Sequence, residues 1–314
     1  MNGRDVAATG QGSTIQLLLW FIFVVSVLTV AARLGTKYAM TRKLGWDDYI
    51  MLAAQTAYLA QCISISIGIA DDLGRPTSEL SSVALDNFLK AEYASVVFFI
   101  IALALIKVSI STFIRQLSRS TTHRKFDWIL QALIGLWALT AVLICLFQCS
   151  LPTPWNYVHG LRCVDRRAWW TYVAILNIVT DLLTVALYVF IIGNLQIPRS
   201  KRLIILSMFL VRLLVVGISI AQLTVFLEVF SYSDPTDTLW LPVILNQTTL
   251  VISTITACAP YLKPFMESLE SNVNRVESIH GSEEELSGNR NGSGGYDMGI
   301  TNSSSACSYR ASRC

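Results

Sequence analysis

Charged residues are scarce in this sequence. Asp, Glu, Lys and Arg make up 14% of its 314 residues, whereas a soluble domain carries about 25%. So few charges do not cover a water-facing surface, and 53% of the residues are hydrophobic. The net charge of +3 is small, which argues against a nucleic-acid partner. The composition therefore favours a membrane protein.

Proline is missing from the middle of every long apolar block, because all eight prolines lie in loops or near block ends. Some transporters build their substrate sites from helices that break at the membrane centre, so this pattern is evidence against that class. The sequence also lacks a nucleophile elbow, a phosphate loop and an HExxH motif. We expect no enzymatic activity, no metal and no cofactor, with an intramembrane enzyme that uses Asp181 as the alternative.

What the sequence has instead is long apolar blocks. A transmembrane helix needs about 20 such residues, and seven blocks have this length, at about 15–32, 49–70, 93–114, 128–149, 169–193, 203–226 and 239–262. They predict an all-α membrane protein, a seven-transmembrane helix bundle over residues 15–265, after a short extracellular segment at 1–14. Residues 266–314 are polar and rich in Gly, Ser and Asn, which predicts a disordered cytoplasmic tail.

Lys and Arg in alternate loops predict the orientation. Eleven of them lie in the loops after the first, third and fifth blocks, and the loop with Arg162, Arg166 and Arg167 is the one exception. Because such residues mark the cytoplasmic side, we expect the N-terminus outside and the C-terminus inside, most simply in the plasma membrane. The first block is followed rather than preceded by positive charge, at Arg33 and Lys37, which favours an uncleaved anchor over a signal peptide.

Several motifs lie at the ends of these blocks: ARLGTKYAMTRKLGWDDYIMLAA, LIKVSISTFIRQL, FQCSLPTPWNYVHGLRC, NIVTDLL with LQIPRSKRL, and ACAPYLKPF. Over about residues 15–265 they resemble the fungal rhodopsin-domain integral membrane proteins. That group includes receptor-like proteins that sense surfaces and proteins encoded beside secondary-metabolite genes. The resemblance implies a receptor-like sensor of an extracellular or surface cue. The alternative is a transporter or export accessory of a secondary-metabolite pathway.

The chain departs from the family pattern at three places. Leu187 and Tyr188 replace a proline of the fifth helix, Arg212 and Gln222 stand where the sixth helix usually carries Gly and Arg, and Asn246 and Gln247 replace an acidic residue near the seventh. A ligand that family members bind through those residues is therefore not expected to bind here in the same way.

The family name suggests two functions, retinal binding and coupling to a G protein, but the sequence lacks the motifs typical of each. A retinal protein holds its chromophore on a lysine of the last helix, and no lysine lies between Leu239 and Leu262. The chain therefore is not expected to bind retinal. It also has no Asp-Arg-Tyr after the third block and no Asn-Pro-x-x-Tyr in the seventh, so coupling to a G protein rests on topology alone. We expect an unknown small-molecule or surface ligand and a cytoplasmic signalling partner at the inner loops and tail.

One carboxylate, Asp181, interrupts the apolar run NIVTDLLTVALYVFI. It lies roughly 18 Å from the outer end of its block, and Arg212 lies roughly 13 Å from the inner end of the next. Charges at similar depth on neighbouring helices usually pair, so we predict an Asp181–Arg212 pair, with Asn177 on the same face. The pair is either a packing device or a ligand or switch site. Lys107, roughly 10 Å from its inner block end, is expected to snorkel to the interface.

Two further groups of residues have alternative interpretations. Asp47 and Asp48 begin the second helix, where they either favour the helix dipole or contact basic residues of the inner face such as Arg33. Cys149 and Cys163 bracket the second outer loop, which favours a disulfide between them. The alternatives are two free thiols or a bridge from one of them to Cys62.

Overall fold

The structure is a computed structural model of the whole chain, and it describes residues 3–70, 81–117, 121–150, 152–157, 163–193, 211–229 and 241–261. The chain divides into two units, Met1–Phe265 and Met266–Cys314, and all the described residues belong to the first. The tail expected at 266–314 and the first part of the block expected at 203–226 lie outside the described residues.

The described residues form an all-α bundle, as expected. Its helices are α1 (Gly3–Thr41), α2 (Trp46–Ala70), α3 (Ser82–Leu117), α4 (Thr121–Leu146), α5 (Arg166–Gly193) and α7 (Arg212–Val229), followed by the helix Leu241–Tyr261. All except α7 are long and apolar enough to cross a membrane. The apolar part described for α7 is shorter, at Arg212–Leu227, and the residues from 194 to 210 lie outside the described part of the chain.

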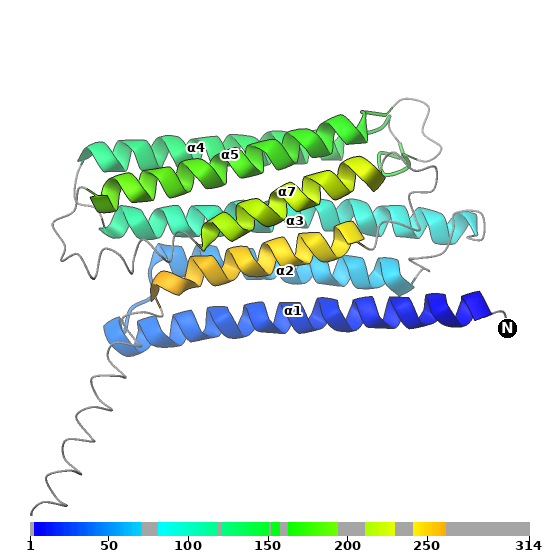
Figure 1. Ribbon diagram of the computed structural model, residues 1–314, viewed down its shortest axis with the longest axis horizontal. Coiled ribbons are helices and arrows are strands. Elements are labelled where there is room, and N and C mark those ends of the chain that lie inside the picture. Colours follow the sequence, from blue (N-terminus) through cyan, green and yellow to red (C-terminus); the bar gives the residue numbers. More distant parts are fainter. Residues whose placement is uncertain are drawn as a thin grey trace, which may run out of the picture. The chain divides into compact units, whose positions relative to one another are not determined.

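Consecutive helices pack side by side. The contacting pairs are α1 with α2, α2 with α3, α3 with α4, α4 with α5, and α5 with α7, and Figure 1 shows these helices running alongside one another. Contacts along the helices show that neighbours run antiparallel: Arg212 at the start of α7 meets Asp181 in the second half of α5, and Phe226 near the end of α7 meets Trp170 near the start of α5. The bundle therefore has two ends. We call them the Asp47 end, where α2 and α4 begin, and the disulfide end, where α5 begins.

Helices α1 and α3 extend furthest beyond the apolar blocks that predicted them. Helix α1 covers Gly3–Thr41 and α3 covers Ser82–Leu117, whereas the blocks cover about 15–32 and 93–114. A helix satisfies its backbone hydrogen bonds internally, so it continues into water after the apolar residues end. Helix α1 stops before Arg42, whose φ of 50° is left-handed and ends the helical hydrogen bonding.

The bundle is apolar outside, and it buries polar and charged side chains among the apolar residues of its core. Leu17, Phe21 and Leu28 are exposed by 73%, 67% and 63%, whereas the side chains with full charges at Lys107 and Asp181 are 0% exposed. A soluble protein shows the reverse arrangement. The exposed apolar surface matches a lipid environment, and together with the candidate spans it makes this a multi-pass membrane protein.

Candidate functional site

Three helices bring charged side chains together in the middle of the bundle. Asp181 of α5 accepts hydrogen bonds from Arg212 Nη2 at 2.7 Å and Nε at 3.1 Å, both on Oδ1. Lys107 Nζ of α3 lies 3.2 Å from the same oxygen. We call these three residues the central charge cluster. The structure thus places the predicted partner of Asp181 in contact with it, and adds a third group that the sequence analysis did not pair.

The position of Lys107 corrects one sequence prediction. Instead of snorkelling to the interface, its side chain is fully buried. Its ammonium donates to Thr180 Oγ1 at 2.7 Å and to the Asn177 carbonyl oxygen at 2.9 Å, and lies 5.2 Å from the Trp137 ring centre. The prediction was wrong because it used only the depth of Lys107 in its span. The rotation of α3 turns the side chain toward α5, where a carboxylate and two oxygens receive it.

Asn177 belongs to the same network, one turn from Asp181. Its backbone oxygen accepts from Lys107, while its side-chain Nδ2 donates to Ser219 Oγ of α7 at 3.0 Å. Asn177 therefore links α3 and α7 through α5. The predicted residue is present in the network, and its hydrogen bonds to other helices join it to Lys107 and Ser219.

The central charge cluster has an excess of positive charge. It holds two cations, Lys107 and Arg212, and one carboxylate, Asp181, and all three are buried. Both cations approach the same oxygen of Asp181, Oδ1. Among the described residues, the other oxygen, Oδ2, has no hydrogen-bond partner, and Arg212 Nη1 has none either. A buried charge without full compensation is costly. The cluster is therefore a site where small changes in position or protonation have large energetic effects.

One face of α7 continues from this cluster toward the disulfide end. Arg212, Ser219 and Phe226 are spaced by seven residues, so they lie on the same side of the helix. Ser219 accepts from Asn177, and the Phe226 ring stacks on Trp170 of α5 at 4.1 Å between ring centres. We call this face of α7 the α7 seam.

Gln222 lies on a neighbouring part of α7 and contacts the last helix. Its Nε2 donates to Asn246 Oδ1, and its Oε1 accepts from Thr249 Oγ1 at 3.3 Å. Two of the positions where the sequence departs from the family pattern, Gln222 and Asn246, are thus direct partners. Neutral amides stand where the family pattern suggests charged residues, and Gln222 finds its partners in Asn246 and Thr249 without a charge.

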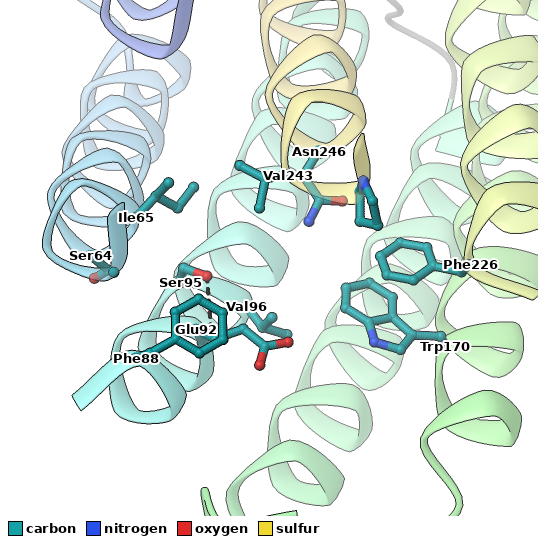
Figure 2. A pocket seen from close by; sticks show the side chains of 12 residues that line it. Ser64, Ile65, Phe88, Glu92, Ser95, Val96, Trp170, Phe226, Val243 and Asn246 are labelled. Carbon is teal, nitrogen blue, oxygen red and sulfur yellow. Dashed lines mark hydrogen bonds between the residues drawn. The ribbon is translucent and has the colours of Figure 1, made fainter. Parts of the chain in front are cut away.

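A small cavity lies where the α7 seam reaches the disulfide end. Residues of five helices line it, including Ser64, Phe88, Glu92, Trp170, Phe226 and Asn246. Figure 2 shows the facing rings of Trp170 and Phe226 on one side, with Phe88 and Glu92 across from them. Its volume is about 30 Å³, which is room for one or two water molecules. In this conformation the cavity has no room for a larger molecule.

The loop at the disulfide end is fastened to α3. A disulfide joins Cys149 and Cys163, in agreement with the sequence prediction. Arg166 Nη2 lies 2.6 Å from Glu92 Oε1, and Tyr157 donates its hydroxyl to Glu92 Oε2 at 2.8 Å. Burial raises the pKa of the Tyr157 phenol, and the nearby Glu92 carboxylate raises it further. Glu92 also lines the cavity, so the loop and the cavity share one carboxylate.

A second buried cluster lies at the Asp47 end. Arg33 Nη2 of α1 lies 2.8 Å from Asp47 Oδ2 and 3.4 Å from Asp48 Oδ1. Lys37 Nζ, one turn further along α1, lies 2.8 Å from Asp47 Oδ2 and 2.5 Å from Asp48 Oδ2. The last helix adds Tyr261, whose hydroxyl donates to Asp47 Oδ2 at 2.5 Å. We call these five residues the end cluster.

The end cluster joins α1, α2, α3 and the last helix. The Arg33 guanidinium lies 4.0 Å from the Tyr261 ring centre, and Ser109 of α3 donates to the Asp47 carbonyl oxygen at 2.9 Å. Asp48 Oδ2 also accepts from the Gly45 backbone N–H at 2.8 Å. Both interpretations of the two aspartates thus have a structural counterpart: they begin α2, and they contact Arg33. A Cβ at Gly45 would collide with the Asp47 carboxylate, so this position needs glycine.

Three residues of these sites were not predicted as site residues: Lys37, Tyr261 and Glu92. Lys37 follows Arg33 by four residues, so both lie on one face of α1, and this spacing was visible in the sequence. Tyr261 and Glu92 gave no such signal, because their partners are distant in the chain. Within the described ranges, no group of three or more His, Cys, Asp or Glu residues is arranged to hold a metal ion.

Comparison with known proteins adds one family. The fungal rhodopsin domain matches residues 32–268, which include both charge clusters and the disulfide. A comparison with curated proteins finds no match. Because the matched region covers well over half of the chain and agrees with the all-α bundle of apolar helices, this chain belongs to the fungal rhodopsin-domain family of multi-pass membrane proteins.

Proposed function

We propose that this chain is a receptor-like sensor of an extracellular or surface cue, with its N-terminus outside, its C-terminus in the cytoplasm and its place in the plasma membrane. The observation that carries the proposal is the α7 seam, which connects the cavity at the disulfide end to the central charge cluster. Phe226 and Arg212 lie 14 residues apart on this face, about 21 Å along the helix axis. A change at the cavity therefore reaches the buried charges through one rigid helix.

The central charge cluster has the properties of a switch. Its two cations, Lys107 and Arg212, share one carboxylate, Asp181. A small change in the surroundings can therefore decide which cation pairs with it. A small shift of α7 moves Arg212 away from Asp181, and Lys107 is already within 3.2 Å to take over the carboxylate. Two arrangements of similar energy in a packed interior are what a conformational signal requires.

The end cluster is the proposed output. It ties α1, α2 and the last helix together at the end that we assign to the cytoplasm. Tyr261 and Arg33 both hold Asp47 there. Movement of the last helix, which Gln222 of α7 contacts through Asn246, would alter these bonds and expose a different surface to a signalling partner. Neither cluster is proposed to act in catalysis, and we propose no enzymatic activity.

Retinal is not part of the proposal. The helix Leu241–Tyr261 carries no lysine, and the buried Lys107 is engaged by Asp181, Thr180 and Asn177. A Schiff base at Lys107 would remove hydrogen-bond donors that these three oxygens use.

The second candidate is a transporter or export accessory of a secondary-metabolite pathway. The observation in its favour is the same excess of positive charge, because an anionic substrate would neutralise it. Buried ionisable groups mark substrate pathways as well as switches. Under this alternative, Arg212 Nη1 would bind the substrate directly.

A complemented deletion strain distinguishes the two candidates. The strain carries the wild-type chain, Lys107→Met, or the control Lys43→Met, which removes an exposed lysine of the α1–α2 loop. It is scored for the response to surface contact and for secondary metabolites inside and outside the cell. For a sensor, Lys107→Met changes the response at normal protein level and leaves the ratio of exported to retained metabolite unchanged. A changed ratio with a normal response contradicts the sensor and supports the transporter.

A further inference from the structure

The outer surface of the bundle has an apolar groove between α4 and α5, which lie side by side (Figure 1). Its walls are formed by apolar side chains at helical spacing, including Phe126, Ile129, Leu133, Leu183, Ala186 and Phe190. The groove encloses about 400 Å³, within the range of about 300–1,000 Å³ for small-molecule sites. It is far larger than the cavity at the disulfide end.

The groove opens to lipid rather than to water. Ile129, Leu183 and Phe190 on its rim are exposed by 65%, 44% and 54%, and all lie within helices long and apolar enough to span a membrane. Eight residues from Phe126 to Leu133 extend roughly 10 Å along α4. A molecule that enters this groove therefore comes from the hydrocarbon region of the membrane, and an alkyl chain fits both its shape and its apolar walls.

Positive charge lies at the end of the groove that belongs to the Asp47 end. His123 stacks on Phe190, with 5.6 Å between ring centres, and Arg124 and Lys125 are exposed immediately before Phe126. Helix α4 begins at Thr121, so the free N–H groups of its first turn and its positive dipole end lie at the same place. The apolar groove therefore ends beside a group of basic residues, His123, Arg124 and Lys125, which we call the mouth.

We propose that this groove is a binding site for an anionic phospholipid. One acyl chain lies between α4 and α5, and the phosphate lies near His123, Arg124 and Lys125. Charge complementarity favours this occupant over a neutral lipid, since Lys and Arg at the membrane surface attract anionic headgroups. The site adds to the proposed function and does not depend on what the chain senses. In the proposed orientation the mouth faces the cytoplasmic leaflet, where anionic lipids are enriched.

The test uses the full chain in nanodiscs that contain equal amounts of phosphatidylcholine and phosphatidylserine. Native mass spectrometry after gentle detergent release counts each lipid that remains bound to the protein. Two variants separate the two parts of the site. Arg124→Gln with Lys125→Gln removes charge from the mouth, and Ala186→Phe fills the groove. The matched control, Arg42→Gln with Lys43→Gln, removes two exposed charges from another loop at the same end of the bundle.

The wild-type chain should retain phosphatidylserine in preference to phosphatidylcholine. In the mouth variant, the ratio of retained phosphatidylserine to retained phosphatidylcholine should fall at least fivefold. A fivefold change corresponds to a loss of about 1 kcal/mol in binding free energy. The groove variant should retain less of both lipids. The control should behave as the wild type. The mouth residues are exposed, so their variant keeps the test valid even where Ala186→Phe does not fold.

Three results would overturn the proposal. Equal retention of the two lipids by the wild type removes the anionic preference. An equal loss in the Arg42 and Lys43 control shows general surface electrostatics in place of a site. A protein dimer that dissociates in the Ala186→Phe variant shows that a second copy of the chain, and not a lipid, fills the groove.

Discussion

Neutralising the three residues of the central charge cluster one at a time should give unequal losses of stability. Asp181→Asn leaves Lys107 and Arg212 as two buried cations without a carboxylate. Lys107→Met leaves the Arg212–Asp181 pair, joined at 2.7 Å. Arg212→Leu leaves the Lys107–Asp181 pair at 3.2 Å. Because only the first change creates unpaired charge, it should be the most damaging of the three.

The magnitude follows from the cost of an orphaned charge. Removing one partner of a buried pair costs about 3–5 kcal/mol, and Asp181 is the carboxylate partner of both cations. For a domain of about 250 residues this cost lowers the melting temperature by roughly 6–20 °C. Lys107→Met should lower stability much less. It loses the hydrogen bonds of the ammonium, but it also removes the excess positive charge, and the second effect offsets part of the first. A simple two-residue pair would instead make Arg212→Leu as damaging as Asp181→Asn.

Thermal unfolding of the purified full chain in detergent measures these differences. Asp86→Asn is the matched control, because it removes a carboxylate from a half-exposed pair with Lys90, which contributes about 0–1 kcal/mol. The triple change of Lys107 to Met, Asp181 to Asn and Arg212 to Leu should recover much of the loss of Asp181→Asn. The reasoning is refuted when Lys107→Met destabilises as much as Asp181→Asn, or when the triple variant is no better than Asp181→Asn.

Three further outcomes are expected. Mass mapping under non-reducing conditions should recover Cys149 linked to Cys163, and replacing both with Ser should cost about 3 kcal/mol on unfolding; two free thiols in protein extracted from membranes would contradict this. A glycosylation reporter fused after Cys314 should remain unmodified, whereas a glycosylated reporter reverses the assigned orientation. Tyr261→Phe should lower stability by about 1.5–3 kcal/mol, because it removes a hydrogen bond to the Asp47 carboxylate; no change in unfolding temperature would show that Tyr261 does not hold Asp47.

The membrane class and the helices were predictable because their signals are local. A bilayer requires about 20 apolar residues in one helix, and this requirement is written in consecutive residues. The approximate position of the disulfide was predictable for the same reason, since Cys149 and Cys163 bracket a short loop. The ends of α1 and α3 were less predictable, because a helix continues past its apolar residues wherever nothing stops it.

Lys107 shows where such reasoning ended. Its depth in the third block was known, and depth alone suggested the interface. The direction in which a side chain leaves its helix depends on the rotation of that helix about its axis, which packing against neighbours decides. In the structure this rotation places the Lys107 ammonium between Asp181 and the Trp137 ring. The structure therefore has a cluster of three charged residues with a net positive charge where the sequence predicted a neutral pair.

By itself, the sequence determined that this is an all-α membrane protein with apolar spans, and it identified Asp181 and Arg212 as buried charges at similar depth. Only the tertiary structure decided which groups meet. Tyr261 and Asp47 are 214 residues apart, and Arg33 contacts the Ala257 carbonyl oxygen at a separation of 224. Such contacts depend on the relative rotation and position of whole helices. A periodic pattern records which residues avoid water or lipid, but it does not record which helix faces which.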